Sequence, residues 1–397
     1  MAKIALVWGL GADLGHITRY SIIAKELIKR GHEPCLILRD IGRMRSILKD
    51  QQLFFLQAPV YQQKTKGLSP PLNLTETLFR VGFAEPKALA SLLVAWRHLY
   101  VTLKPDVIVF DHAPVAQLAA LDQPYPTMSL TNTVSMPPVT GPCPRYRYWL
   151  NEDGAEKRMA ESEARCLEII NQAQQELGLN PVPSLATFLH HGEQVFCERP
   201  EFDVYGRRDN CRYIGSINDD SLGALPSWPN SKGRKVFAYL KTRFKHLETL
   251  LALLARAETN TIAFVPGLSE KLRKKFTSTS LIFSTEPLQL RALAQQCDYA
   301  ICHGGTGTVS VFADAGKPML CIPLQVEQMM FSTRVAETGL AKVFPLGGKN
   351  NELKPLFQNF FGDNELITQA AQWASVREVA TMDERVSNAC DLIEAQI

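Results

Sequence analysis

The stretch CHGGTGTVSVFADAGKP, residues 302–318, places three glycines and two threonines behind a histidine and then continues as an apolar helical pattern. The apolar residues YAIC that lead into it are typical of a buried parallel strand. A strand that ends in glycines and opens into a helix presents unpaired backbone N–H groups at the positive end of the helix dipole. The loop therefore predicts a phosphate-binding site, although a tight strand-to-helix turn with capping threonines would use the same residues.

Short apolar runs alternate with helical patterns on both sides of this loop. This alternation is typical of βαβ units, which build a mostly parallel sheet with helices on both faces. We expect strands at residues 3–9, 34–40, 104–111, 127–131, 235–240, 260–267, 280–285, 299–305 and 318–324. We expect helices at residues 16–31, 75–104, 152–179, 244–257, 287–297, 308–316, 326–340 and 377–397.

The length of the chain, 397 residues, is too great for one ordinary core and predicts two domains. Residues 215–234 are rich in turn-forming residues and have little apolar pattern, so we expect a linker there. The predicted fold class is α/β, with two Rossmann-like, doubly wound domains at 1–214 and 235–375. A last helix is expected within 376–397.

Composition excludes several classes of function. The net charge of +3 does not indicate a nucleic-acid partner or an anionic membrane surface. Nine cysteines are scattered without a C-x-x-C motif, as in a protein with reduced thiols. The opening apolar run is too short for a signal peptide, and no segment is long enough for a transmembrane helix. We therefore expect a soluble, cytoplasmic protein.

The spacing around the glycine loop is more specific than the loop itself. Counted from His303, a glycine and a proline of GKP follow at 13 and 15 residues, a second proline at 20, and Glu327 and Gln328 at 24 and 25. With Pro287, which lies 16 residues before His303, this pattern resembles the donor-binding signature of the family 1 glycosyltransferases, the UDP-glycosyltransferase superfamily. The resemblance implies the GT-B fold, with two domains facing across a cleft and the last helix packed back on the first domain.

The resemblance also implies roles for individual residues. His303 and the loop after it would hold the diphosphate of a nucleoside-diphosphate sugar, and Glu327 and Gln328 would bind the hydroxyl groups of the sugar. The implied donor-binding residues are Pro287, His303, Gly304, Gly305, Thr306, Gly307, Thr308, Glu327 and Gln328. Two positions depart from the family, because Val311 replaces a ribose-binding glutamate and Thr285 replaces a residue that stacks on the base. The identity of the donor base and sugar therefore stays open.

A second glycine-rich loop, GLGADLGH at residues 9–16, follows the first expected strand. It is a loose dinucleotide fingerprint, so an oxidoreductase that binds a nicotinamide cofactor through Gly9, Gly11 and Asp40 is one alternative. In the resembling family the histidine that ends this loop is the general base, and an aspartate at the end of a later strand orients it. Those residues would be His16 and Asp111, with Asp13 as a second candidate base.

The expected reaction is transfer of a hexose from a UDP- or dTDP-sugar to an acceptor hydroxyl, with inversion. The chain has no D-x-D motif, so we expect neither a metal nor a bound cofactor. Residues 136–149, with Phe79 and Trp96, are the candidate acceptor wall. Two alternatives remain, namely a sugar-nucleotide epimerase of the same fold and a non-catalytic nucleotide-sugar-binding protein. The sequence leaves the acceptor and the oligomeric state open.

Overall fold

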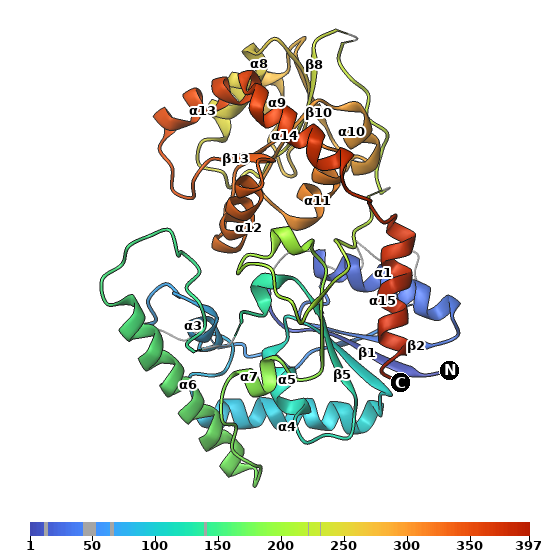
Figure 1. Cartoon of the computed structure of the whole chain (residues 1–397), viewed down its shortest axis with the longest axis vertical. Coiled ribbons are helices and arrows are strands. Elements are labelled where there is room, and N and C mark those ends of the chain that lie inside the picture. Colours follow the sequence, from blue (N-terminus) through green and yellow to red (C-terminus); the bar gives the residue numbers. More distant parts are fainter. Residues whose placement is uncertain (12–14, 43–52, 64–66, 139–140, 221, 231) are drawn as a thin grey trace. The chain divides into compact units, whose positions relative to one another are not determined.

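The computed structural model of the chain divides into two compact units (Figure 1). It describes residues 1–11, 15–42, 53–63, 67–138, 141–220, 222–230 and 232–397. The first unit consists of Met1–Pro200, Tyr205–Asn218 and Thr381–Ile397. The second unit consists of Glu201–Val204 and Asp219–Ala380.

The first unit is built on a parallel sheet with the strand order β3-β2-β1-β4-β5-β6-β7. Its strands are β1 (Lys3–Trp8), β2 (Glu33–Leu38), β3 (Phe54–Gln57), β4 (Val107–Asp111), β5 (Thr127–Thr131), β6 (Glu193–Phe196) and β7 (Arg212–Tyr213). In β1, Ala5 and Val7 belong to one core and Ile4 and Leu6 to another. The strand is thus buried on both faces, which is why it is a continuous apolar run in the sequence.

Helices cover both faces of this sheet. One face carries α3 (Leu74–Leu78), α4 (Pro86–Leu103), α5 (Pro114–Ala120) and α7 (Ala186–Leu189), with α6 (Ala155–Glu176) packed on α3 and α4. The other face carries α1 (Gly15–Lys29) and α15 (Met382–Glu394). The single helix expected at 75–104 is two helices, because Gly82 adopts a φ of 111° and Pro86 begins a new helix.

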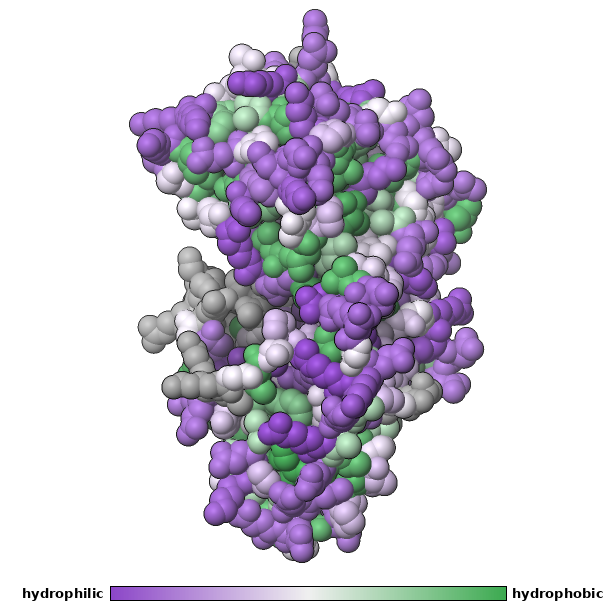
Figure 2. Space-filling model, turned by 90° about the vertical axis from the view of Figure 1, so that its left-hand side faces the viewer, coloured by the Kyte–Doolittle hydropathy of each residue, from purple (hydrophilic) through white to green (hydrophobic). Residues whose placement is uncertain are grey.

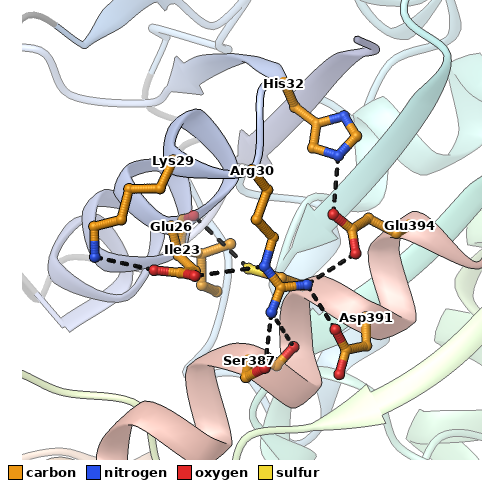
Figure 3. A network of polar contacts seen from close by, with 9 residues as sticks. Ile23, Glu26, Lys29, Arg30, His32, Ser387, Asp391 and Glu394 are labelled. Carbon is orange, nitrogen blue, oxygen red and sulfur yellow. Dashed lines mark hydrogen bonds and ion pairs between the residues drawn. The ribbon is translucent and has the colours of Figure 1, made fainter.

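The last helix, α15, is held on α1 by charged side chains as well as by apolar packing (Figure 3). Arg30 Nη1 donates to Asp391 Oδ1 at 2.6 Å and to Glu394 Oε2 at 2.8 Å. Arg30 Nη2 donates to Ser387 Oγ at 2.7 Å, and His32 Nε2 lies 2.9 Å from Glu394 Oε1. The end of the chain is thereby part of the first unit.

The second unit is also a parallel sheet, with the strand order β10-β9-β8-β11-β12-β13. Its strands are β8 (Arg234–Tyr239), β9 (Thr259–Phe264), β10 (Leu281–Ser284), β11 (Tyr299–Cys302), β12 (Met319–Cys321) and β13 (Ala341–Val343). Its helices are α8 (Leu247–Arg256), α9 (Glu270–Phe276), α10 (Leu290–Gln296), α11 (Thr306–Asp314), α12 (Val326–Glu337), α13 (Asn350–Gly362) and α14 (Asn364–Ser375). The predicted α/β class with two doubly wound parallel sheets is confirmed.

The segment expected as a linker, 215–234, is divided between the two units. Residues up to Asn218 belong to the first unit, and the second unit begins at Asp219. The later part is held by backbone hydrogen bonds, since the Ala224 N–H donates to Pro287 O at 2.9 Å. A short earlier segment also belongs to the second unit, where Phe202 stacks on Trp373 at a ring-centroid distance of 5.3 Å.

None of the helices in the described parts of the chain is long and apolar enough to cross a membrane. On the face shown in Figure 2, hydrophilic residues predominate and apolar residues are interspersed among them. The cytoplasmic location expected from the sequence stays a prediction.

Candidate functional site

In each sheet the chain reverses its direction of winding between two central strands. In the first unit these strands are β1 and β4, which pair in parallel with Trp8 opposite Asp111. In the second unit they are β8 and β11, with Tyr239 opposite Cys302. Ligands of open α/β sheets bind at this switch point, beyond the carboxyl ends of the strands. His16 and Asp111 lie at the switch point of the first unit, and His303 lies at that of the second.

His16 and Asp111 meet at the switch point of the first unit. His16 is the second residue of α1, and Asp111 is the last residue of β4. The imidazole Nδ1–H donates to Asp111 Oδ2 at 2.7 Å. The Trp8 ring stacks on the imidazole, with ring centroids 5.5 Å apart and planes 16° apart. This contact and the hydrogen bond together fix the orientation of the His16 ring.

Asp111 is completely buried and accepts hydrogen bonds from three side chains. Besides His16, the donors are Thr131 Oγ1, at 2.8 Å from Oδ1, and Arg19 Nη1, at 3.4 Å from Oδ2. Arg19 is itself buried and also donates to Asn132 Oδ1. Burial by itself would raise the pKa of Asp111, but the charges of His16 and Arg19 and these hydrogen bonds hold that pKa well below its ordinary value. Asp111 is therefore an anion throughout the neutral range.

Arg19 and Thr131 belong to this cluster but were not predicted. Arg19 follows His16 by three residues on α1, so the two side chains share one face of the helix. That spacing was a usable signal for Arg19. Thr131 ends β5, and its position beside Asp111 depends on the pairing of β5 with β4. The linear sequence does not state which strands are neighbours.

The glycines of the first loop pack against residues of the protein itself. A Cβ on Gly9 would lie 2.9 Å from the Cα of Ala113. Gly11 has a φ of 103°, and a Cβ there would lie 2.9 Å from Nε2 of His16. These contacts account for both glycines without a bound dinucleotide. Asp13, the second candidate base, lies outside the described residues.

His303 follows β11 at the switch point of the second unit and is largely buried. Its ring meets the ring of Tyr239 edge to face, with centroids 4.8 Å apart. Lys241 Nζ donates to the Tyr239 hydroxyl at 2.8 Å and lies 4.5 Å from the ring centroid. The structure thus gathers an imidazole, a phenol and an ammonium group at the carboxyl ends of β8 and β11. Arg243, which lies two residues after Lys241 in the sequence, is exposed.

The glycine loop after His303 leads directly into α11, which begins at Thr306. Gly304 has a φ of 76°, and a Cβ there would lie 2.2 Å from Ser332 Oγ. A Cβ on Gly305, the N-cap residue of α11, would lie 3.1 Å from His303 Nε2. The amides at the start of α11 come from Gly305, Thr306, Gly307 and Thr308. Their arrangement is that of an anion-binding helix start.

The other predicted donor residues differ in their exposure. Glu327, in the first turn of α12, is exposed. Gln328 is buried, and its Oε1 accepts a hydrogen bond from the Leu324 N–H at 3.0 Å. Its amide NH₂ is therefore the group that it can offer to a ligand. Pro287 is exposed between β10 and α10, and its carbonyl accepts the hydrogen bond from Ala224.

The two positions that depart from the family pattern lie on different elements of the second unit. Val311 is half-buried on α11, one turn after the glycine loop. Thr285 is exposed in the turn that follows β10. Neither side chain carries a charge or an aromatic ring, so both positions would bind a nucleoside differently from the family pattern.

The candidate acceptor wall lies in the first unit and is partly core. Phe79 and Trp96 are buried in the cluster beneath α3 and α4. Of the described residues of 136–149, Met136 and Cys143 are buried. Residues 139–140 lie outside the described part of the chain. Phe79, Trp96 and Cys143 belong to one hydrophobic core, and Trp96 also lines a cavity.

Within the described residues, no group of three or more histidine, cysteine, aspartate or glutamate side chains is arranged to hold a metal ion. The metal-independent reaction expected from the sequence is not tested by this finding and stays a prediction.

Comparisons with known proteins support the fold. No family model and no curated protein matches the sequence. Among solved structures, the glycotransferase of kitacinnamycin is 16% identical with a TM-score of 0.69, covering 100% of this chain and 99% of its own. The calicheamicin glycosyltransferase CalG4 is 15% identical with a TM-score of 0.70, covering 100% and 98%. The spinosyn rhamnosyltransferase SpnG complexed with thymidine diphosphate is 14% identical with a TM-score of 0.64, covering 100% and 99%. The chain has the GT-B fold, as the resemblance predicted.

Proposed function

On this fold, we propose that the protein is a glycosyltransferase that moves a sugar from a nucleoside-diphosphate sugar to an acceptor hydroxyl, with inversion and without a metal ion. The observation that carries the proposal is the hydrogen bond from His16 to the buried, anionic Asp111 at the switch point of the first sheet. A histidine held in this way is suited to remove a proton from a hydroxyl group.

In the proposed reaction the acceptor oxygen attacks the anomeric carbon of the donor sugar. The bond between that carbon and the diphosphate oxygen breaks, and the nucleoside diphosphate leaves with the electron pair. Because Nδ1 of His16 donates to Asp111, Nε2 is the nitrogen that takes the acceptor's proton. Asp111 then stabilises the imidazolium that forms. A single displacement of this kind inverts the configuration at the anomeric carbon.

The leaving diphosphate would be stabilised by the second unit. His303, the amides of residues 305–308 and the hydroxyl of Thr308 are the proposed ligands, with the start of α11 supplying a positive dipole end. Lys241, two residues after β8, would add a positive charge beside His303. These groups can together supply the charge stabilisation that a divalent cation supplies in other transferases.

The donor is proposed to be a UDP- or dTDP-sugar. Support for a thymidine nucleotide comes from the likeness to SpnG, which binds thymidine diphosphate. Support for a separate acceptor comes from the same neighbour, which also forms a complex with the spinosyn aglycone. The pairing of His16 with Asp111 favours a transferase over the epimerase and the non-catalytic binding protein.

A thermal-shift series with dTDP, UDP, GDP and NADH tests the proposal. A ligand at 100 times its dissociation constant stabilises the unit that binds it by about 2.7 kcal/mol, or about 5–10 °C. We expect dTDP or UDP to give this shift, and we expect His303→Ala to abolish it. Lys274→Ala, which changes an exposed lysine on α9 of the same unit, is the matched control and should retain the shift. A response to NADH alone, or to no nucleotide, would contradict the proposed function.

A further inference from the structure

A small cavity lies at the carboxyl ends of β1, β2 and β4 in the first unit, and its volume is about 50 Å³. A buried water needs about 10–15 Å³ measured in this way, so the cavity has room for about three to five water-sized atoms, enough for the three heavy atoms of a carboxylate group. Its lining residues are Gly9, Leu10, Arg39, Pro59, Val60, Tyr61, Arg80, Val81, Trp96, Ala113, Pro114, Val115 and Ala116. None of these residues is acidic.

The polar lining consists mainly of hydrogen-bond donors that lack an anionic partner. The Arg39 guanidinium has no hydrogen bond or ion pair with any described residue. Arg80 donates to the backbone carbonyls of Glu76 and Ser69 and to no described carboxylate. Trp96 is 1% exposed, and its Nε1–H is buried without an acceptor among the described residues. Of these three residues Trp96 alone is buried, since Arg39 and Arg80 are half-buried, and a bound anion would give the indole N–H the acceptor that it lacks.

The positive charge of Arg39 acts on the buried side chain of His112. Burial lowers the pKa of His112 to about 3, and the positive charges of His16 and Arg39 act in the same direction against the opposing charge of Asp111. His112 is therefore neutral at pH 7, and the two guanidinium groups leave the lining of the cavity with a net positive charge.

The cavity and the proposed catalytic pair both lie beyond the carboxyl ends of β1 and β4, although His16 and Asp111 do not line the cavity. Gly9 and Leu10 precede the loop that leads to His16, and Ala113 follows Asp111 by two residues. The rest of the lining is apolar or aromatic, including Val60, Tyr61 and Val115. A molecule with an anionic end and an apolar body would fit both parts of this surface.

We propose that this cavity binds the carboxylate of the acceptor, so that the acceptor is a hydroxy acid held by Arg39, Arg80 and the Trp96 indole N–H. This inference rests on the proposed function, because it names the class of acceptor that the transferase would use. Arg39 and Trp96 are then the residues that determine acceptor specificity, and the hydroxyl of the acid is presented to His16.

The test uses the full chain with ¹⁵N-labelled tryptophan, whose five indole N–H signals are assigned by single replacements such as Trp96→Phe. The probes are 4-hydroxybenzoate and the neutral 4-hydroxybenzamide, which has nearly the same shape. We expect the acid to move the Trp96 signal in a saturable way and the amide to leave it unchanged. Arg39→Met should weaken binding of the acid at least tenfold, because it removes one partner of a charged hydrogen bond.

Arg97→Met is the matched control, since Arg97 is the neighbour of Trp96 on α4 but does not line the cavity. This variant should bind the acid as the unchanged chain does. Equal responses to the acid and the amide, or movement of another indole signal but not that of Trp96, would overturn the inference. An equal response to acetate or inorganic phosphate would assign the cavity to free anions and would also overturn the acceptor assignment.

Transfer assays separate this inference from the proposed function. With a nucleotide sugar that passes the thermal-shift test, we expect kcat/KM for 4-hydroxybenzoate to exceed that for the amide at least tenfold, and Arg39→Met to remove the difference. Transfer to neutral acceptors without a Trp96 response to the acid refutes the inference and leaves the proposed function standing. A Trp96 response in a protein that binds no sugar nucleotide refutes the proposed function, and with it the role of the cavity in binding an acceptor.

Discussion

Replacing Asp111 with asparagine removes a buried charge while nearly preserving shape. The asparagine carbonyl can still accept hydrogen bonds from His16 and Arg19, and its amide can donate to the Thr131 hydroxyl, which is free to rotate. The hydrogen-bond pattern can therefore survive, and the change isolates the loss of the negative charge. Two charged groups lose their partner, namely the Arg19 guanidinium in the resting protein and the His16 imidazolium during the reaction.

The size of each effect follows from the geometry. Arg19 is buried, so breaking its ion pair with Asp111 should cost about 3–5 kcal/mol, which lowers the melting temperature of the first unit by about 6–20 °C. The imidazolium loses an anion at hydrogen-bonding distance, worth about 4 kcal/mol at a separation of 4 Å and an effective dielectric constant of 20. That loss corresponds to a decrease of about 10³-fold in kcat. Donor binding, which is proposed for the second unit, should be unchanged.

Melting curves and turnover of the variant at pH 7 measure both effects. Asp106→Asn is the control, because Asp106 is near β4 but only accepts a hydrogen bond from the Lys3 N–H at an exposed site. The folded-state pKa of Asp111 lies below its ordinary value of 3.8, so its stabilisation is present above about pH 4 and is lost as the pH falls further. The stability difference between Asp111→Asn and the unchanged chain should therefore shrink from pH 7 to pH 3. A stability difference that is as large at pH 3 as at pH 7, or a kcat within tenfold of the original at pH 7, would refute this reasoning.

Three further substitutions test other contacts. Gly11→Ala should lower kcat more than tenfold without changing donor binding, and steady-state kinetics measures kcat. The added Cβ would press on His16 Nε2, and a φ of 103° is strained for alanine. Gly304→Ala should abolish the thermal shift given by the donor nucleotide, since its Cβ would lie 2.2 Å from Ser332 Oγ. Arg30→Met should speed amide hydrogen exchange in α15 at low salt, with a stability loss of about 1 kcal/mol, because α15 loses its charged contacts with α1.

The sequence predicted the central strands of both sheets and the edge strand β10, but it missed four other strands. Central strands such as β1 and β4 are buried on both faces and are continuous apolar runs. The strand β3 lies at the edge of its sheet, where Phe54 is 59% exposed, and it was not predicted. The strands β6, β7 and β13 were also missed, although β10, β11 and β12 are equally short and were predicted. An edge strand pairs with a single neighbouring strand and is little buried, so its sequence has a weak apolar pattern.

In the candidate sites, too, features within one segment of sequence were predicted, whereas contacts between separate strands were not. His16, Asp111 and His303 were predicted from the family resemblance, which rests on local patterns: His16 ends a glycine loop, His303 precedes one, and Asp111 ends an apolar strand. The packing of Tyr239 on His303 was not predicted, because it depends on β8 lying next to β11. The cavity lined by Arg39, Arg80 and Trp96 was missed for the same reason, because these residues come from separate segments of the chain. Contacts across strands require the strand order, which the apolar pattern does not specify.

Glycine spacing was the most ambiguous signal, and the structure explains why. In the first unit Gly11 leaves room for Nε2 of His16, and in the second unit Gly305 leaves room for Nε2 of His303. Both loops therefore need a glycine to seat their own histidine ring, whether or not a phosphate also binds there. A motif that counts glycines cannot separate these two causes. Judged by the atom that an added Cβ would meet, Gly9, Gly11, Gly304 and Gly305 all face protein atoms, so packing within the protein accounts for each of these glycines.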